Sequence, residues 1–297
     1  MIQSCRARIM ENESLRGGFW LLRLEAPHVA RDCIPGQFIM LRGLGADWPH
    51  LRRPFSIYSS DGESVVEVVY KVVGRATSIM ARTHGGHYEI LGPLGKGFTL
   101  PAHKYTLALA GGAGLPPVAY YCRKYVGLLD KVVLVIGART NTELLVPVGL
   151  VAQGVEIRPY TDDGSKGARG TVVDGLVKAL GEASGRAGAG TLQASSGGSG
   201  CDGHGAGRTD GAPGAAAHTQ PGGLHVIACG PKQMLARVAS VCDGAGVPCE
   251  ASVEEVMACG LGACLACAVP RQGGGYLHAC SEGPVFEAGT IDWERWL

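Results

Sequence analysis

Hydrophobic positions in the first hundred residues come in short, partly alternating runs, and each run is closed by glycine, proline or aspartate. Such runs are typical of strands in antiparallel sheets, and several in succession favour a small barrel. We therefore predict an antiparallel β-barrel over residues 1–100. Its predicted strands include residues 19–24, 37–42, 55–59 and 65–73.

The pattern changes after Pro101 to continuous apolar runs separated by helical stretches such as residues 117–125. This alternation predicts an α/β domain with a parallel sheet over residues 101–245. Residues 181–223 interrupt it with a segment of mostly Gly, Ala and Ser that contains no aromatic residue, valine or isoleucine. Such a segment buries too little surface to offset its ordering entropy, so we predict a disordered insertion. The predicted buried strands are residues 106–110, 132–136, 155–160 and 224–229.

Four cysteines near the C-terminus have the spacing Cys-x4-Cys-x2-Cys followed by a lone fourth, which is the plant-type [2Fe-2S] pattern. Gly260 and Gly262 lie among them and allow the loop to turn through positive φ, with N–H groups close to sulfur. A zinc knuckle or free thiols are the alternatives. The pattern predicts a small [2Fe-2S] domain over residues 246–297, for which the cluster is the main fold determinant. The predicted ligands are Cys259, Cys264, Cys267 and Cys280.

The charge balance points to no polyanionic partner. Lys plus Arg number 27 against 26 for Asp plus Glu, so a net charge of +1 provides no general field for nucleic acid or anionic membrane. Eleven cysteines, an odd number, argue against a complete disulfide framework and for reduced thiols. No apolar run reaches the ~18 residues needed to span a bilayer, and Met1 to Met10 lacks the core of a signal peptide. We expect a soluble cytoplasmic protein.

A glycine-rich turn follows the first predicted strand of the α/β domain. Counting from Gly112, it reads Gly-x-Gly-x-x-Pro, which suits a pyrophosphate at a helix N-terminus. Alone it is a weak signal, since a plain strand-to-helix turn has similar composition. A second turn follows the last predicted strand, and ligands of doubly wound sheets bind beyond the carboxyl ends of the strands. Both turns are therefore expected to line one crevice. The predicted dinucleotide-binding residues are Gly111, Gly112, Gly114, Pro117, Cys229, Gly230 and Pro231.

In the predicted barrel, residues 52–57 read Arg-Arg-Pro-Phe-Ser-Ile. Arginine pairs bidentately with phosphate or stacks on a ring, and a hydroxyl can bond a flavin edge. A solvated surface pair is the alternative for Arg52 and Arg53.

Together these motifs resemble the ferredoxin-NADP reductase superfamily, whose barrel binds FAD and whose second domain binds a nicotinamide dinucleotide. The run from Ser252 to Cys267 is similar to the cluster signature of the electron-transfer subunits of dihydroorotate dehydrogenase B, as are residues 35–38, 91–95 and 161–165. The resemblance covers nearly the whole chain outside residues 181–223.

The resemblance implies a fold, cofactors and a partner. It implies FAD, a [2Fe-2S] cluster and NAD, with no catalytic side chain because the cofactors do the chemistry. Ala76 departs from the family, which usually has glycine there. The implied partner is an FMN-containing catalytic subunit that oxidises dihydroorotate, in a heterotetramer that serves pyrimidine biosynthesis. The implied FAD-binding residues are Arg53, Pro54, Phe55, Ser56, Tyr70, Lys71, Val72, Ala76 and Thr77.

Two other functions stay open at this point. The same cofactors would serve an NAD(P)H reductase subunit for a hydrogenase, ferredoxin or oxygenase. A non-catalytic module in which zinc holds the cysteines is the alternative from another class.

Overall fold

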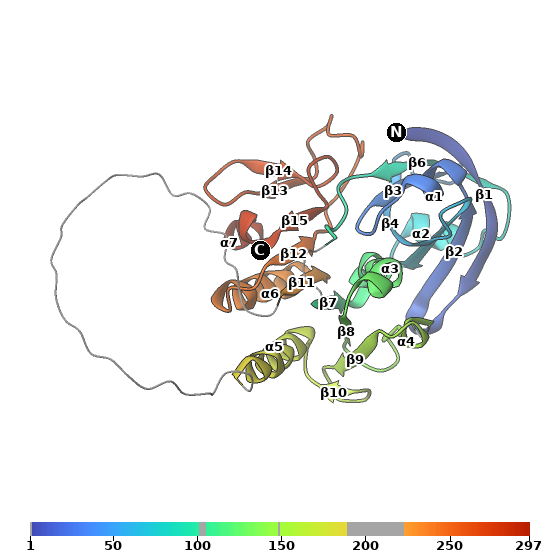
Figure 1. The fold of residues 1–297 in the computed structure, drawn as a ribbon. Helices are drawn as coiled ribbons and strands as arrows, with labels where there is room; N and C mark the ends of the chain where they lie inside the picture. The colour runs from blue at the N-terminus through green and yellow to red at the C-terminus, as the bar shows by residue number, and fades with distance from the viewer. Residues whose placement is uncertain (1, 101–104, 148, 189–222) are drawn as a thin grey trace, which may run out of the picture.

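Residues 2–100 of the computed structural model form a closed six-stranded antiparallel barrel (Figure 1). The model describes residues 2–100, 105–147, 149–188 and 223–297. Inward side chains such as Leu22, Ile39, Ile57 and Ile90 fill the barrel, and each is fully buried. Around the barrel the strands follow the order β1 (Gln3–Ser14), β2 (Phe19–Glu25), β5 (Val65–Lys71), β4 (Arg53–Ser60), β3 (Phe38–Gly43) and β6 (His87–Leu94).

A seven-stranded sheet forms the second layer of the molecule. All neighbouring strands in it are parallel except the last pair, β12 and β15, which is antiparallel. Its three central strands are mostly apolar and buried, as expected for a parallel sheet covered on both faces. Their order is β10 (Ala168–Arg169), β9 (Glu156–Thr161), β8 (Lys131–Ala138), β7 (Tyr105–Gly111), β11 (Leu224–Cys229), β12 (Cys249–Ser252) and β15 (Val285–Glu287).

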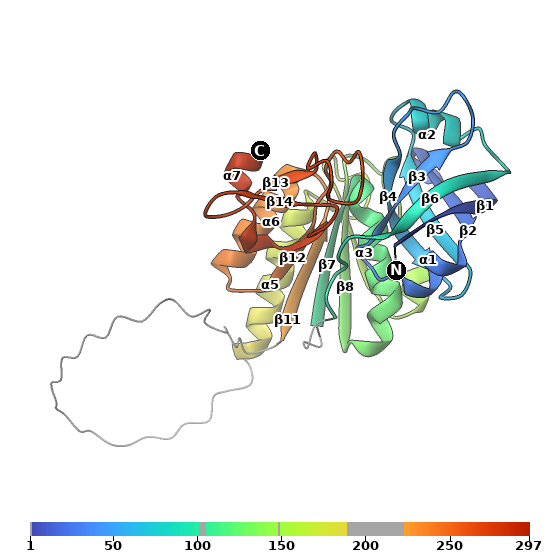
Figure 2. The same cartoon turned by 90° about the horizontal axis from the view of Figure 1, so that it is seen from above.

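Helices cover both faces of the sheet (Figure 2). Helices α5 (Val172–Gly188) and α6 (Lys232–Gly244) pack on one face, whereas α3 (Leu115–Tyr125) and the short α4 (Gly149–Ala152) pack on the other. Helix α3 lies between the sheet and the barrel, so it contacts both. The barrel carries the short helices α1 (Pro27–Asp32) and α2 (Arg75–Met80), and the 3-10 turns are η1 (Arg16–Gly18), η2 (Gly112–Gly114), η3 (Val126–Leu128) and η4 (Ala288–Thr290).

The C-terminal segment combines sheet strands with a small separate hairpin. Strands β12 and β15 extend the large sheet, whereas β13 (Ala268–Pro270) and β14 (Tyr276–His278) pair only with each other, and α7 (Trp293–Trp296) ends the chain. The buried side chains of this segment share one core with α6 and with the barrel residues Met40 and Leu94. No helix among the described residues is long and apolar enough to cross a membrane.

The predicted fold class is confirmed: an antiparallel barrel, an α/β domain with a parallel sheet and a C-terminal cysteine-rich segment are all present. Helix α5 continues through Gly188, past the start of the predicted insertion at residue 181, because its apolar face packs on β7, β8 and β9. Residues 189–222 of that predicted insertion lie outside the described residues.

Candidate functional site

The cluster loop is the segment from Cys259 to Cys267, and it directs backbone N–H groups at sulfur. Gly262 N lies 3.1 Å from Cys280 Sγ, and Leu261 N lies 3.3 Å from Cys259 Sγ. Gly260 and Gly262 have φ of 73° and 79°, which confirms the predicted left-handed turns. N–H groups aimed at sulfur stabilise thiolate, the form in which cysteine binds metal.

The four thiols form two contacting pairs, Cys259 with Cys264 and Cys267 with Cys280. The N–H groups of Leu261 and Cys264 lower the pKa of Cys259 to about 6. Burial and the neighbouring Cys267 thiol raise the pKa of Cys280 to about 12. An iron bound to that pair would remove the proton outright.

Two pairs of thiols fit a binuclear cluster, in which each iron takes two protein sulfurs. Within the described part of the chain, no group of three or more His, Cys, Asp or Glu side chains surrounds the position of a single metal ion. The fit therefore rests on the spacing, the pairing of the thiols and the N–H groups directed at them.

The cluster loop packs directly on the barrel. A Cβ at Gly260 would lie 2.7 Å from Met40 Cγ and 3.3 Å from Leu94 Cδ1, so only glycine allows this approach. Met40 on β3 pairs with Pro54 on β4, which belongs to the predicted flavin motif. The predicted cluster and the predicted flavin strand are thus separated by a single strand of the barrel.

The flavin motif occupies the start of β4 and is half-buried. Arg53 Nη1 donates to the carbonyl oxygens of Leu51 and Arg52 at 3.0 and 3.1 Å, which orients the guanidinium. The Ser56 hydroxyl makes no hydrogen bond to any described residue, so it is free to bond a ligand. An oriented cation and an unpartnered hydroxyl on one strand fit the edge and phosphates of a flavin nucleotide.

The other residues implied for FAD fall into two groups. The Tyr70 side chain is buried in the barrel, where its hydroxyl donates to Asn12 Oδ1 at 3.1 Å. A ligand would therefore contact Tyr70 through its backbone. Val72 is 43% exposed and extends the surface beyond β5, while the Lys71 ammonium lies 4.8 Å from the Phe19 ring centre. The Lys71 charge is therefore held over an aromatic ring.

Helix α2 holds the last implied pair, Ala76 and Thr77, which are both buried. The Thr77 hydroxyl accepts from Val73 N at 3.0 Å and from Gly74 N at 3.1 Å, so it caps the helix. The backbone N–H groups of Ala76 and Thr77 lie in the first turn of the helix, where N–H groups have no intrahelical acceptor. These N–H groups suit a pyrophosphate.

The two predicted dinucleotide turns meet, as expected. A Cβ at Gly114 would lie 2.3 Å from the Cys229 carbonyl carbon and oxygen and 2.5 Å from Gly230 N. On the other side, a Cβ at Gly230 would lie 3.2 Å from Gly111 Cα. The turns pack backbone against backbone at the carboxyl ends of adjacent strands β7 and β11, which is where doubly wound sheets bind ligands.

Pro117 is in the first turn of α3, a position where proline costs no hydrogen bond. Pro231 precedes α6 directly, and Cys229 is buried at the end of β11. Burial raises the pKa of the Cys229 thiol, so it is a neutral, small side chain beneath the turn. A groove of about 1670 Å³ opens elsewhere, between α6 and the C-terminal residues, and no predicted cofactor residue lines it.

Sequence reasoning missed the residues that join the predicted sites. Met40, which contacts the cluster loop, looks like any other barrel residue in the sequence. Tyr58 and Arg123 connect β4 to α3 through a hydrogen bond of 2.9 Å, and Tyr120 reaches Cys33 from the same helix. Pairings between segments this far apart in sequence leave no local signal.

Comparison with known proteins gives a consistent result. Residues 254–292 match the family model described as the iron-sulfur cluster binding domain of dihydroorotate dehydrogenase B. The electron transfer subunit of dihydroorotate dehydrogenase B (NAD(+)) from Desulforamulus reducens is 31% identical over 281 residues, which cover 93% of each chain. The subunit of the same name from Geobacillus kaustophilus is 32% identical over 265 residues, or 86% of each chain.

Solved structures show the same fold at lower identity. An NADH-dependent reduced ferredoxin-NADP oxidoreductase superposes with a TM-score of 0.75 at 22% identity and covers 98% of this chain and 91% of its own. A ferredoxin NADP+ reductase from Neisseria gonorrhoeae, solved with bound FAD and NADP, has a TM-score of 0.59 at 18% identity, with 82% and 92% covered. With these folds shared and near-complete curated relatives above 30% identity, this chain belongs to the family of dihydroorotate dehydrogenase B electron-transfer subunits.

Proposed function

We propose that this chain carries electrons between the FMN of a dihydroorotate-oxidising catalytic subunit and NAD+, by way of a [2Fe-2S] cluster and FAD. The observation that supports this most is the meeting of the three predicted cofactor segments around β4. The cluster loop packs on Met40 of β3, whose partner across the ladder is Pro54 of β4, and α3 also packs on β4. The short path from the predicted cluster loop across β3 to the predicted flavin strand supports electron transfer between a one-electron site and a two-electron site.

A flavin at this position would supply the conversion that the function needs, since it exchanges a hydride with nicotinamide and single electrons with an iron-sulfur cluster. The protein's own part is to bind and orient. Arg53 and Ser56 would hold the flavin, the N–H groups at the start of α2 its pyrophosphate, and Gly112 and Gly114 the dinucleotide. Glycine at these last positions lets the backbone approach the ligand.

Exposed apolar side chains around the cluster support a docking surface for the catalytic subunit. Val256 is 77% exposed, Leu265 56% and Leu261 52%. Large apolar side chains gathered on a surface often mark a contact with another protein. We propose that they contact the catalytic subunit within a heterotetramer in the cytoplasm, where the odd set of eleven cysteines stays reduced.

An anaerobic absorbance spectrum before and after NADH, with iron and sulfide assayed on the same sample, tests the cofactor part of this proposal. Flavin and cluster bands that both bleach on NADH are expected. A colourless chain that contains zinc and cannot be reconstituted with FAD, iron and sulfide would refute it.

The partner part needs a separate test. The chain is co-expressed with a dihydroorotate dehydrogenase catalytic subunit and isolated by affinity capture. Val256→Asp should weaken the complex without changing the spectrum, because it places a charge in an apolar contact. Val177→Asp, at another exposed position (55%) on α5, is the control. A complex with full stability in Val256→Asp, or co-purification of a hydrogenase or oxygenase instead, would contradict the proposed partner.

A further inference from the structure

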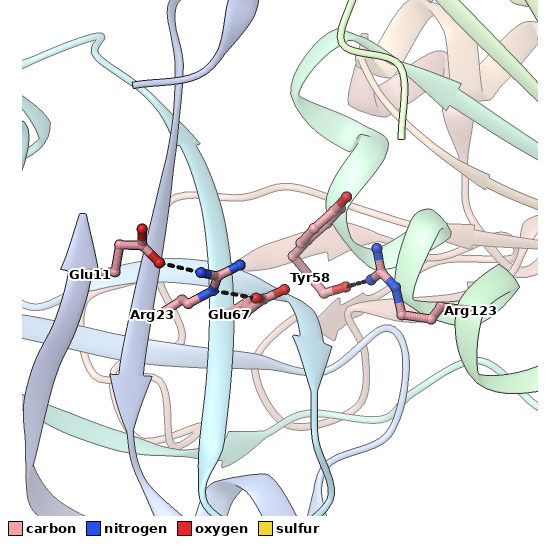
Figure 3. A network of polar contacts seen from close by, with 5 residues as sticks. All are labelled: Glu11, Arg23, Tyr58, Glu67 and Arg123. Atoms are coloured by element: carbon pink, nitrogen blue, oxygen red, sulfur yellow. Dashed lines mark hydrogen bonds and ion pairs between the residues drawn. The ribbon is translucent and has the colours of Figure 1, made fainter. Parts of the chain in front are cut away.

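Tyr58 lies at a β-bulge in the predicted flavin strand. The β4–β5 ladder pairs Ile57 with Val68 and Ser59 with Glu67, so Tyr58 has no partner on β5. A bulge interrupts the ladder and redirects the side chain of the extra residue. The Tyr58 carbonyl is thereby available, and Arg123 Nη1 donates to it at 2.9 Å (Figure 3).

Arg123 holds Tyr58 through the side chain as well. Its guanidinium carbon lies 4.6 Å from the centre of the Tyr58 ring. A guanidinium can stack on an aromatic ring while its N–H groups bond in their own plane, which a lysine ammonium cannot do. One side chain therefore fixes both the backbone and the ring of Tyr58.

The position of this contact gives it a consequence. Tyr58 follows Ser56 by two residues on β4, while Arg123 lies on α3, whose first residues follow Gly114 in the dinucleotide turn. The neighbouring α3 residues bond elsewhere on the barrel: Tyr120 and Lys124 donate to the Cys33 carbonyl, just after α1, at 3.3 and 3.0 Å. Arg123 thus connects the helix of one predicted cofactor site to the strand of the other.

We propose that Arg123 is a positioning residue for hydride exchange between nicotinamide and flavin, because its contact with Tyr58 fixes β4 relative to α3, the helix that begins directly after Gly114. The inference rests on the proposed function. Hydride transfer requires reacting atoms about 3 to 3.5 Å apart, and a shift of about 1 Å can cost roughly 100-fold in rate. Arg123 is not among the residues predicted to bind either ligand, and its hydrogen bond and ring contact are both with Tyr58, so its loss should change the rate and not the binding.

The test uses the full FAD-loaded chain and three variants. Arg123→Met removes the guanidinium and keeps the length of the side chain, and Arg123→Lys restores the charge without the planar fork. Arg23→Met is the matched control, since Arg23 also bonds two neighbours across strands, Glu11 and Glu67, but does so within the barrel alone (Figure 3). For each variant we would measure FAD content, NADH affinity and thermal unfolding.

Two further readouts address positioning. Anaerobic stopped-flow absorbance gives the limiting rate at which NADH reduces the flavin. In this reaction one hydride passes from the nicotinamide to the flavin, so that NADH is oxidised to NAD+ and the reduced flavin takes up one proton from solvent. The long-wavelength charge-transfer band reports direct contact between the two rings. In Arg123→Met we expect a rate of flavin reduction lower by roughly 10- to 100-fold and a weaker charge-transfer band, with FAD content and NADH affinity retained. The rate and band of Arg123→Lys should lie between those of Arg123→Met and wild type. Arg23→Met should match the wild type.

An unchanged rate and band in Arg123→Met would overturn the inference. So would loss of FAD from Arg123→Met when Arg23→Met retains it, because Arg123 would then support cofactor binding. If Arg123→Met fails to fold, Arg123→Lys decides, since it keeps the charge and the aliphatic stem. A wild-type flavin that NADH cannot reduce would refute the proposed function itself, which is visible before any variant is compared.

Discussion

Replacing Gly114 by alanine is a sharp test of the dinucleotide crevice. Gly114 has φ of −74°, an ordinary value for any residue, so the substitution causes no backbone strain of its own. Its effect comes from the added methyl group, which would lie 2.3 Å from the carbonyl carbon and oxygen of Cys229. Ordinary contact begins at 3.4 Å, so the methyl group is 1.1 Å too close to a backbone that cannot rotate away.

The turn must therefore move by about 1 Å from Cys229 and Gly230, or the helix behind it must shift. Overpacking of this kind costs about 1 to 3 kcal/mol, and we expect the upper end because the clash is with backbone. A displacement of about 1 Å at a reacting centre lowers the rate roughly 100-fold, which corresponds to about 2.7 kcal/mol in the activation free energy.

Stopped-flow reduction of the flavin by NADH measures the rate, and denaturant unfolding measures the stability. Gly181→Ala is the control, because Gly181 lies in α5 with open space around its Cβ position, and alanine there should stabilise the helix by roughly 0.5 to 1 kcal/mol. A Gly114→Ala chain that keeps the wild-type rate within about twofold and loses no stability would refute the reasoning.

Two further predictions concern the C-terminal segment. Cys280→Ser should lose most of its iron and the visible cluster bands, because the substitution removes a buried ligand of one thiol pair. The control Cys5→Ser, in the barrel, should retain both. A full iron content in Cys280→Ser, measured by colorimetric assay, would contradict the predicted ligand set. Desolvation opposes ionisation of Glu255, but hydrogen bonds from Lys232 and Trp296 prevail and lower its pKa below 4.5. This carboxylate thus stabilises the fold above pH 4.5 and loses that contribution as the pH falls through its lowered pKa. Glu255→Gln should lower the free energy of unfolding by about 1 kcal/mol at pH 7, a small value because Lys232 is partly exposed to solvent. In acid unfolding curves the difference in stability between this variant and wild type should shrink. A difference that does not change with pH would exclude this role for Glu255.

Much of the architecture was predictable from local patterns. The apolar runs of β7, β8 and β11 have the length and composition of buried parallel strands, and the structure places each within a residue or two of its prediction. The barrel was harder, because β1 carries many charged and polar side chains and β6 contains Gly92 and Pro93, which are typical of turns, so neither strand was singled out. Their membership in the barrel is decided by long-range pairing with each other and with β3.

The cluster loop was predictable because three of the four predicted ligands lie within nine residues of one another. Cysteine spacing and intervening glycines together specify a loop around sulfur, and the positive φ of Gly260 and Gly262 agrees. By contrast, the contact of Gly260 with Met40 joins segments more than two hundred residues apart, so no window of sequence contains it. The same holds for the bulge at Tyr58, which depends on a change of register between two strands.

The antiparallel pairing of β15 with β12 has a consequence for the modularity of this chain. Both strands belong to the same sheet as β7 and β11. A gene fusion that replaced everything after residue 245 with a foreign cysteine-rich module would therefore remove β12 and β15 from this sheet. Strand β11 would then be an unpaired edge strand. A recombination point before β7 would instead exchange the dinucleotide turns and the cluster loop together, as one continuous segment. Chimaeras between reductases with different electron acceptors should therefore keep residues 105–297 together. The barrel residues that contact the cluster loop, which include Met40 and Leu94, should be taken from the same parent as that loop.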